Sequence, residues 1–285
     1  MKSEMLNMNR LLALLAKNWF ENKRTYLLFF LSVAVFLAGW FTFVLVVFRN
    51  QLRMSPSDQV AMYFVGLYIA GGLSGSLLFQ DFSSRTRASN FLSLPASTFE
   101  KLFCILFYSV FIFFVAYTAI YLLTDWVAIK IAARIFSPEW QYAHGIAQPY
   151  YTFEVANPLS LNADRSLFYP GDNLDLFAGY FPYQSCFILG ALYFSKNSIV
   201  KTVIVLFSLL FLFLTLEQRI IFPSMPAGTS MAKVFSAYII PDVDGNEQIV
   251  ALPAWIGDSV AFAARFLVTP AIWLACYFRI KEKEI

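Results

Sequence analysis

The chain has 285 residues, of which 59% are hydrophobic and 14% charged, and its formal net charge is +3. Soluble domains carry about 25% charged residues, so this composition excludes an ordinary soluble protein. The small net charge argues against a nucleic-acid partner, which would require a basic face. We therefore expect a single membrane domain over 1–285.

The first predicted element is an amphipathic helix over 4–22. Its apolar side chains recur every three to four residues: Met5, Met8, Leu12, Leu15 and Trp19. Polar and cationic side chains occupy another face, which is typical of a helix that lies in the membrane interface and contacts lipid. No small-residue cleavage site follows, so the pattern does not indicate a signal peptide. The helix either anchors the first span or docks a partner.

Six apolar runs follow, and each approaches the length of about 20 residues that a membrane helix needs. They cover approximately 26–48, 60–79, 102–123, 176–194, 199–216 and 256–278. Because a spanning segment must satisfy its backbone internally, the predicted fold class is an all-α membrane protein with six transmembrane helices. Four residues interrupt the fourth run: Gly179, Pro182, Gln184 and Gly190.

The basic residues predict the orientation of these spans. With a cytoplasmic N-terminus, inner segments hold 13 Lys and Arg residues and outer segments hold seven. The positive-inside rule then places both termini in the cytoplasm. The segments 125–175 and 217–255 are predicted to be extracytoplasmic.

No motif in the sequence predicts catalysis. The lone histidine, His144, lies in an outer segment, and Cys104, Cys186 and Cys276 lack the spacing of a metal or redox pair. The chain has no P-loop, HExxH or GxSxG motif. We therefore expect no enzyme activity, no cofactor and no metal on this chain.

Polar residues inside the predicted spans are the candidate intramembrane site, because such residues usually face a partner or water. Arg265 lies in the sixth run with Asp258 seven positions earlier, and Gln184 lies in the fourth. Arg265 either binds an anionic group of a substrate or lipid, or pairs with an acid on another helix. A patch of small residues in the second run either allows tight helix packing or lines a substrate passage; its members are Gly71, Gly72, Ser74, Gly75 and Ser76.

A short polar stretch, 83–97, separates the second and third runs. Pro95 disfavours helix at the residue before it. Ser97 followed by Glu100 matches a capping box, with Ser97 as the N-cap of the third span. The stretch predicts a short cytoplasmic helix or turn, although an ordinary loop before a capped helix also fits.

The run Phe91-Leu92-Ser93-Leu94-Pro95-Ala96-Ser97-Thr98-Phe99-Glu100-Lys101 is similar to a stretch in some permease subunits of bacterial type-2 ABC exporters. The predicted topology resembles that family over the whole chain, although the motif-like part is short. The resemblance implies that 83–97 forms a coupling helix seated in a separate ATP-binding subunit. It also implies a partly inserted hairpin between the fifth and sixth spans.

This resemblance supplies the functional expectation. It implies a bacterial inner-membrane permease that exports an amphipathic or lipid-like substrate, as a homodimer or with a sister permease, while a partner ABC subunit binds ATP and Mg. The implied ATPase-coupling residues are Arg85, Arg87, Phe91, Leu92, Pro95 and Glu100. The alternatives are a membrane scaffold or immunity protein that transports nothing, and a membrane-embedded enzyme, against which the near absence of histidine and of paired acids in the spans argues.

Overall fold

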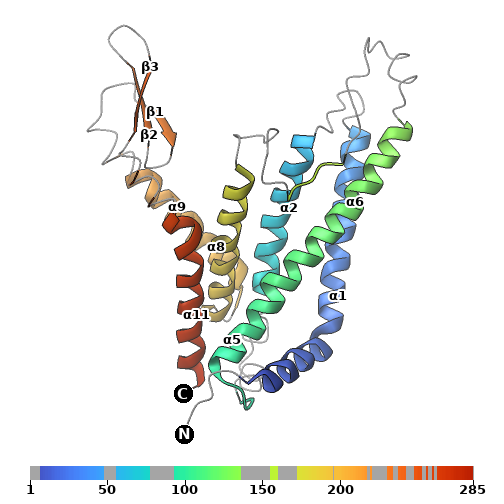
Figure 1. Ribbon diagram of the computed structural model, residues 1–285, viewed down its shortest axis with the longest axis vertical. Coiled ribbons are helices and arrows are strands. Elements are labelled where there is room, and N and C mark those ends of the chain that lie inside the picture. Colours follow the sequence, from blue (N-terminus) through green and yellow to red (C-terminus); the bar gives the residue numbers. More distant parts are fainter. Residues whose placement is uncertain are drawn as a thin grey trace.

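The computed structural model describes residues 7–47, 56–77, 93–135, 155–159, 172–194, 196–216, 230–233, 237–241, 247–251 and 262–284, with three isolated residues between 219 and 259. These segments form a helical bundle with a small sheet at one end (Figure 1). The helices are α1 (Met8–Val47), α2 (Pro56–Leu77), α5 (Thr98–Leu106), α6 (Phe113–Ile135), α8 (Asp172–Tyr193), α9 (Ser198–Leu216) and α11 (Val268–Glu284). Two π-helical segments, η1 (Phe107–Ile112) and η4 (Ala263–Leu267), precede α6 and α11.

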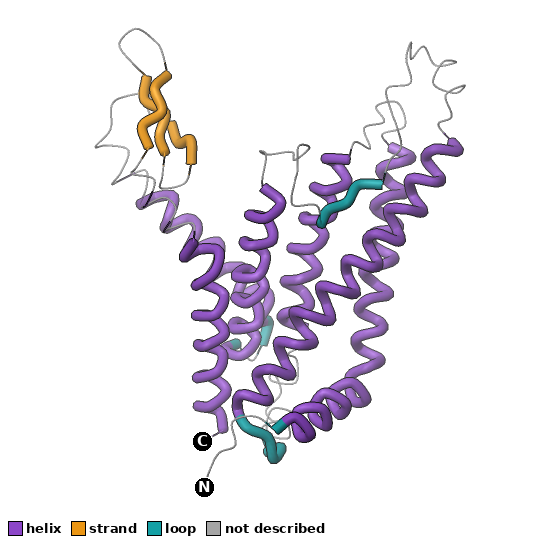
Figure 2. Tube along the Cα trace, viewed as in Figure 1, coloured by secondary structure: helices purple, strands orange, loops and turns teal. Residues whose placement is uncertain are grey.

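Helix α1 joins the predicted interfacial stretch to the first predicted span in one continuous element. Its first turns lie across the lower end of the bundle beside α5, and the helix then turns upward to run along α6 (Figure 1). The start of α1 and the end of α11 lie at this same end of the bundle. The loops drawn in Figure 2 include one before α5 and another, 155–159, toward the far end of the bundle.

Four of the described helices are long and apolar enough to cross a membrane, which indicates a membrane protein. They are Met8–Val46, Asp58–Leu77, Thr98–Ile135 and Ser198–Leu216. They correspond to the first, second, third and fifth predicted runs. Helices α8 and α11 occupy the fourth and sixth runs, but over the described residues they do not meet this criterion.

The third helix is longer than predicted. It runs from Thr98 through η1 to Ile135, whereas the apolar run ends near Leu123. Asp125, Ala128, Ile129 and Ala132 are buried at helical spacing, so the side of α6 that faces the bundle continues past the apolar run. The first residues of the predicted outer segment 125–175 therefore belong to α6. The helix extends past the end of the apolar run because the side of a helix that packs against the bundle can also include polar residues.

The segment 217–255 contains three short strands that the expectation of a purely helical chain did not include. Strands β1 (Ser230–Lys233), β2 (Ala237–Pro241) and β3 (Glu247–Ala251) form an antiparallel sheet in the order β1-β2-β3. Tyr238 pairs with Val250 and Ile239 with Ile249. Aromatic and β-branched residues favour strands, and here they occur in runs too short to cross a membrane.

The core of the bundle is rich in tyrosine, and the hydroxyl groups of several of these tyrosines bond to polar groups on other helices. Tyr117 donates to the carbonyl of Tyr63 (2.9 Å), and Tyr121 donates to the carbonyl of Gln59 (2.6 Å). Tyr63 itself shares a hydrogen bond with Thr118 (2.9 Å). Unsatisfied polar groups are costly in an apolar interior, so these bonds make buried tyrosine tolerable and join α6 to α2.

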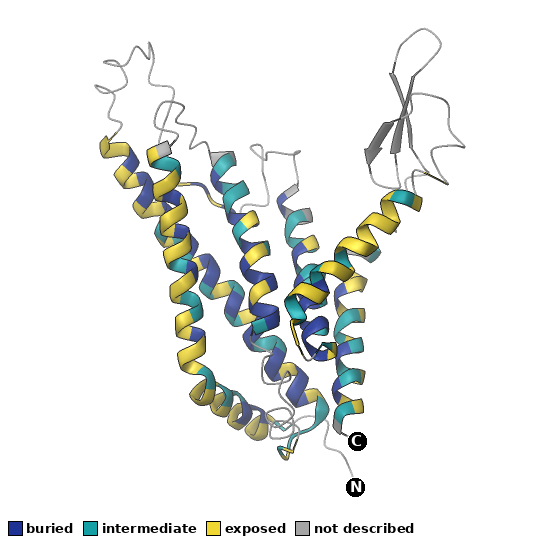
Figure 3. Ribbon diagram, turned by 180° about the vertical axis from the view of Figure 1, so that it is seen from behind, coloured by how far each residue is buried: buried dark blue, intermediate teal, exposed yellow. Residues whose placement is uncertain are grey.

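The small-residue patch serves tight packing between α2 and α8. A Cβ atom added at Gly71 would lie 2.6 Å from the Tyr180 ring, and one at Gly75 would lie 3.2 Å from Phe187 Cβ. Figure 3 shows buried residues along both helices, whereas α9 and the outer side of α1 are largely exposed. The packing interpretation of this patch is therefore confirmed for these glycines.

We predict that Gly71→Ala lowers the thermal stability of the detergent-extracted protein. Tyr180 is fully buried, so it cannot move aside freely, and overpacking of this kind typically costs about 1–3 kcal/mol. Gly39→Ala is the matched control, because a Cβ atom at Gly39 meets nothing within 4 Å. Alanine favours helix over glycine, so the control should keep or raise the melting temperature. Equal melting temperatures for the two variants would contradict the packing argument.

Candidate functional site

The candidate site begins with the N-terminal cap of α5, where the chain leaves the stretch 83–97. The Ser97 hydroxyl accepts a hydrogen bond from the Glu100 backbone N–H (3.2 Å), and Glu100 Oε2 accepts one from the Ser97 backbone N–H (2.8 Å). Both bonds of the predicted capping box are present. The box is therefore confirmed, and it orients the Glu100 carboxylate toward the start of its own helix.

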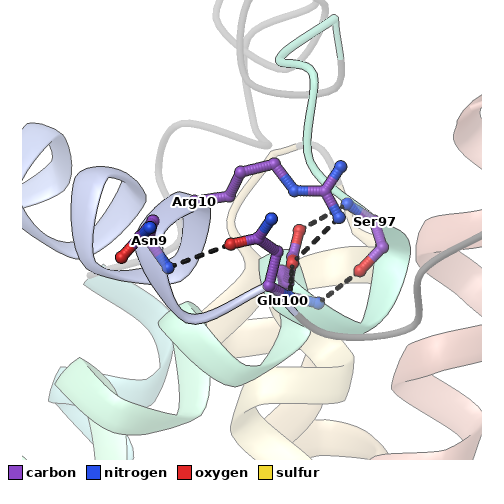
Figure 4. A network of polar contacts seen from close by, with 5 residues as sticks. Asn9, Arg10, Ser97 and Glu100 are labelled. Carbon is purple, nitrogen blue, oxygen red and sulfur yellow. Dashed lines mark hydrogen bonds and ion pairs between the residues drawn. The ribbon is translucent and has the colours of Figure 1, made fainter.

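The other oxygen of the same carboxylate holds the start of α1. Glu100 Oε1 accepts hydrogen bonds from the Asn7 backbone N–H (2.7 Å) and from Arg10 Nη2 (3.3 Å). The Asn7 side chain in turn accepts a hydrogen bond from the Asn9 backbone N–H (3.1 Å). Figure 4 shows the contacts of Arg10 and Ser97 with Glu100, and the separate contact made by Asn9 beside them. We call this set (Asn7, Asn9, Arg10, Ser97 and Glu100) the Glu100 junction.

The electrostatics of the junction favour an ionised carboxylate. The Glu100 side chain is fully buried, while that of Arg10 is 41% exposed. The first backbone N–H groups of both α1 and α5 lie near the carboxylate, and helix N-termini carry positive partial charge. Hydrogen bonds to an ionised acceptor are the stronger kind. A single carboxylate thus connects two helices that lie 90 residues apart in the sequence.

A cluster of aromatic residues makes a second connection between α1 and the third helix. The Tyr108 hydroxyl donates to the Leu15 carbonyl (2.9 Å), and the rings of Tyr26 and Tyr108 stack with centroids 5.4 Å apart. The Trp19 ring lies parallel to that of Tyr108 at 6.5 Å. The first half of α1 is therefore held at both Glu100 and Tyr108. Only its apolar periodicity was visible in the sequence, because its partners lie far along the chain.

The predicted ATPase-coupling residues have different positions. Arg85, Arg87, Phe91 and Leu92 lie outside the described residues. Pro95 is exposed in the turn before α5. Glu100 is buried and bonded within the chain, so any effect it has on a docked partner would pass through the position of α1 and α5.

Gln184 is the predicted intramembrane residue that the structure places in detail. Its amide nitrogen donates to the Ser109 carbonyl (2.5 Å) and to the Ser74 hydroxyl (3.3 Å). Ser109 lies in η1, where the π-helical pattern changes the local backbone hydrogen bonding. Gln184 therefore links α8 to α2 and η1.

The other two predicted polar residues are described only in part or not at all. Arg265 lies in η4 with its side chain outside the description, and Asp258 lies outside the described residues. Sequence reasoning missed Asp125, which it placed in a loop but which is fully buried in α6. The signal available in the sequence was its position one helical turn after Tyr121. In the described part of the chain, no group of three or more His, Cys, Asp or Glu side chains could hold a metal ion.

Comparisons of the chain with protein-family models, with curated proteins and with solved structures return no match.

We predict that Glu100→Gln releases the first half of α1. The amide keeps the shape of the side chain but loses the charge that strengthens its bonds to Arg10 and to the two backbone donors, a loss of about 1.5–3 kcal/mol. Hydrogen exchange of the full-length protein in lipid nanodiscs should show faster exchange over residues 7–20.

The control is Ser97→Ala, which removes one half of the capping box and should cost about 1 kcal/mol at α5. This variant leaves the contacts of Glu100 to Asn7 and Arg10 in place, so exchange over 7–20 should stay close to wild type. If Glu100→Gln shows wild-type protection there, the carboxylate does not hold α1.

Proposed function

We propose that this chain is the transmembrane subunit of an ATP-driven ABC transporter, energised by a separate ATP-binding subunit that carries ATP and Mg. The observation that carries the proposal is the Glu100 junction, which lies directly after the proposed coupling segment 83–97 and joins it to two helices. The resemblance of the stretch Phe91 to Lys101 to type-2 ABC exporter permeases supports the same function.

The junction offers a mechanical route for coupling. A force on the segment before Ser97 acts on the cap of α5, and the same carboxylate transmits it to α1 through Asn7 and Arg10. Helix α5 continues through η1 into α6 as far as Ile135. Movement at the cap would therefore reach the far end of the bundle, and Gln184 would carry part of it to α8.

A cleft between α1, α2 and α6 supports an amphipathic or lipid-like substrate. Its volume is about 310 Å³, within the usual range of ligand sites. Apolar side chains dominate its lining, among them Phe29, Val33, Phe36, Leu37, Ile69 and Leu73. Because these helices are long and apolar enough to span a membrane, an acyl chain is the chemistry that this lining accommodates.

The proposed assembly has two permease subunits in a bacterial inner membrane, as a homodimer or with a sister permease, and both termini of this chain are cytoplasmic. Helix α9 has a composition suited to contacts with lipid or with a second permease. Among its side chains Thr202 is buried, whereas apolar residues along its length, such as Val200, Phe207 and Phe211, are exposed.

We predict that Phe91→Ala combined with Leu92→Ala weakens retention of the ATP-binding subunit. Apolar anchors dominate the affinity of docked segments, and their loss should reduce the amount of a P-loop protein that co-purifies from native membranes by about tenfold or more. Arg87→Glu should weaken retention more strongly at low salt than at high salt, because exposed charges are screened.

Ser97→Ala serves as the control for this experiment and should retain the ATP-binding subunit. Wild-type retention by a folded double variant would refute the coupling role of this segment. If the wild-type chain retains no P-loop protein at all, the non-transporting scaffold or immunity protein becomes the better hypothesis.

We also predict that Ile69→Trp, which fills the cleft, reduces labelling of α1 and α2 by a phospholipid with a photoreactive acyl chain. Val65→Trp is the matched control, since Val65 is also exposed on α2 but is not among the residues that line the cleft. Peptide mapping by mass spectrometry would measure the labelling. Equal labelling in both variants would mean that acyl chains do not occupy this cleft.

A further inference from the structure

Asp125 is a buried acid that the proposed coupling route does not use. It lies on α6, and its side chain is fully buried. Neither carboxylate oxygen has a hydrogen-bond partner among the described residues. An ionised carboxylate in such a position is very unfavourable unless a cation or several donors face it.

The cations of α6 do not supply that compensation. Lys130 lies on the exposed side of the helix, where its ammonium group is 3.8 Å from the centroid of the Trp126 ring. Arg134 is also exposed, on the last turn. The buried side of α6 near Asp125 instead carries Tyr121, Ala128 and Ile129, of which Tyr121 is titratable and interacts electrostatically with Asp125.

The neighbouring elements bring no described cation to Asp125 either. On α1, which packs along α6, residues 27–47 include no titratable side chain, and Phe41 contacts the Tyr121 ring. On α2, the titratable groups at this end are Asp58 and Tyr63. The loop 155–159 has none. On α8, Tyr180 is buried in the same core, and the side chains of the acids 172 and 175 are not described.

Hydrogen bonds next to Asp125 link three elements at the far end of the bundle. The Tyr121 hydroxyl, one helical turn before Asp125, donates to the Gln59 carbonyl (2.6 Å). The Gln59 side chain accepts a hydrogen bond from the Ala156 backbone N–H (2.8 Å). We call Tyr121, Gln59 and Ala156 the far-end clasp. It joins α6, α2 and the loop 155–159 directly beside the buried acid.

We propose that Asp125 is a proton-binding site that controls the far-end clasp. With the clasp closed, as in this structure, the carboxyl holds a proton and is neutral. Loss of the proton would leave an uncompensated charge among apolar groups, so the ionised form is stable only when α6 separates from α2 and water reaches the carboxylate. Opening of this end of the bundle is thereby linked to proton release, whether or not an ATP-binding subunit is present.

Labelling with dicyclohexylcarbodiimide, an apolar reagent that reacts with protonated carboxyl groups, tests the first part of the proposal. The full-length protein in liposomes should be modified at Asp125, as mapped by mass spectrometry, and modification should fall as the pH is raised. Asp125→Asn should remove this label and leave any others unchanged. A wild-type protein that is labelled only at other carboxyl groups would overturn the proposal.

Thermal stability between about pH 5 and about pH 8 tests the link to packing. Because the folded state favours the protonated acid, stability of the wild type should decline as the pH rises. Asp125→Asn, which resembles the neutral acid, should lack this pH-dependent loss of stability. Its melting temperature should therefore exceed that of the wild type by a margin that grows as the pH rises. An ion pair with a cation outside the described residues predicts the opposite result: no labelling, and an Asn variant that is less stable at every pH. If the Asn variant does not fold, the labelling of wild-type Asp125 is the test: labelling that falls as the pH rises supports the proposal, and absence of labelling overturns it.

Discussion

Polar groups inside this bundle depend on the protein for their partners, because hydrocarbon offers none. Several side chains find such partners by reaching backbone carbonyls on other helices. Tyr117 and Tyr121 do so on α2, and Gln184 does so on η1. The helices are thus held in register by hydrogen bonds as well as by apolar packing, and glycines on α2 allow the close approach that these bonds need.

The Glu100 junction applies the same constraint at the other end of the bundle. A buried carboxylate is acceptable there because donors from two helices and a guanidinium face it. Asp125 lacks such donors in the described part of the chain. Two acids on one continuous helix therefore differ in their surroundings. The ionised carboxylate of Glu100 holds two helices together, whereas the carboxyl group of Asp125 is the proposed proton-binding site.

In the two proposals, the two ends of the helix that runs from α5 through η1 to α6 have different roles. Under the proposed function the Glu100 end would receive movement from the segment before Ser97, while under the proton-binding proposal the Asp125 end would determine how readily α6 leaves α2. Between these ends the helix is continuous, although its hydrogen-bond pattern changes from α to π at η1. Gln184 of α8 bonds to the Ser109 carbonyl in this segment. A rigid element held at both ends by polar contacts suits transmission across a membrane, since neither contact can be lost without exposing a buried polar group.

The sequence by itself determined the membrane class, four of the spanning helices and the capping box of Ser97 and Glu100, because apolar length and capping chemistry are local properties. It did not determine that α6 continues to Ile135 or that strands form between 230 and 251. Only the tertiary structure decided which side chains meet. The partners of Tyr108 and Gln184, and those of Glu100 on α1, lie about 75 to 110 residues away along the chain. Nothing in a local pattern specifies contacts at that separation.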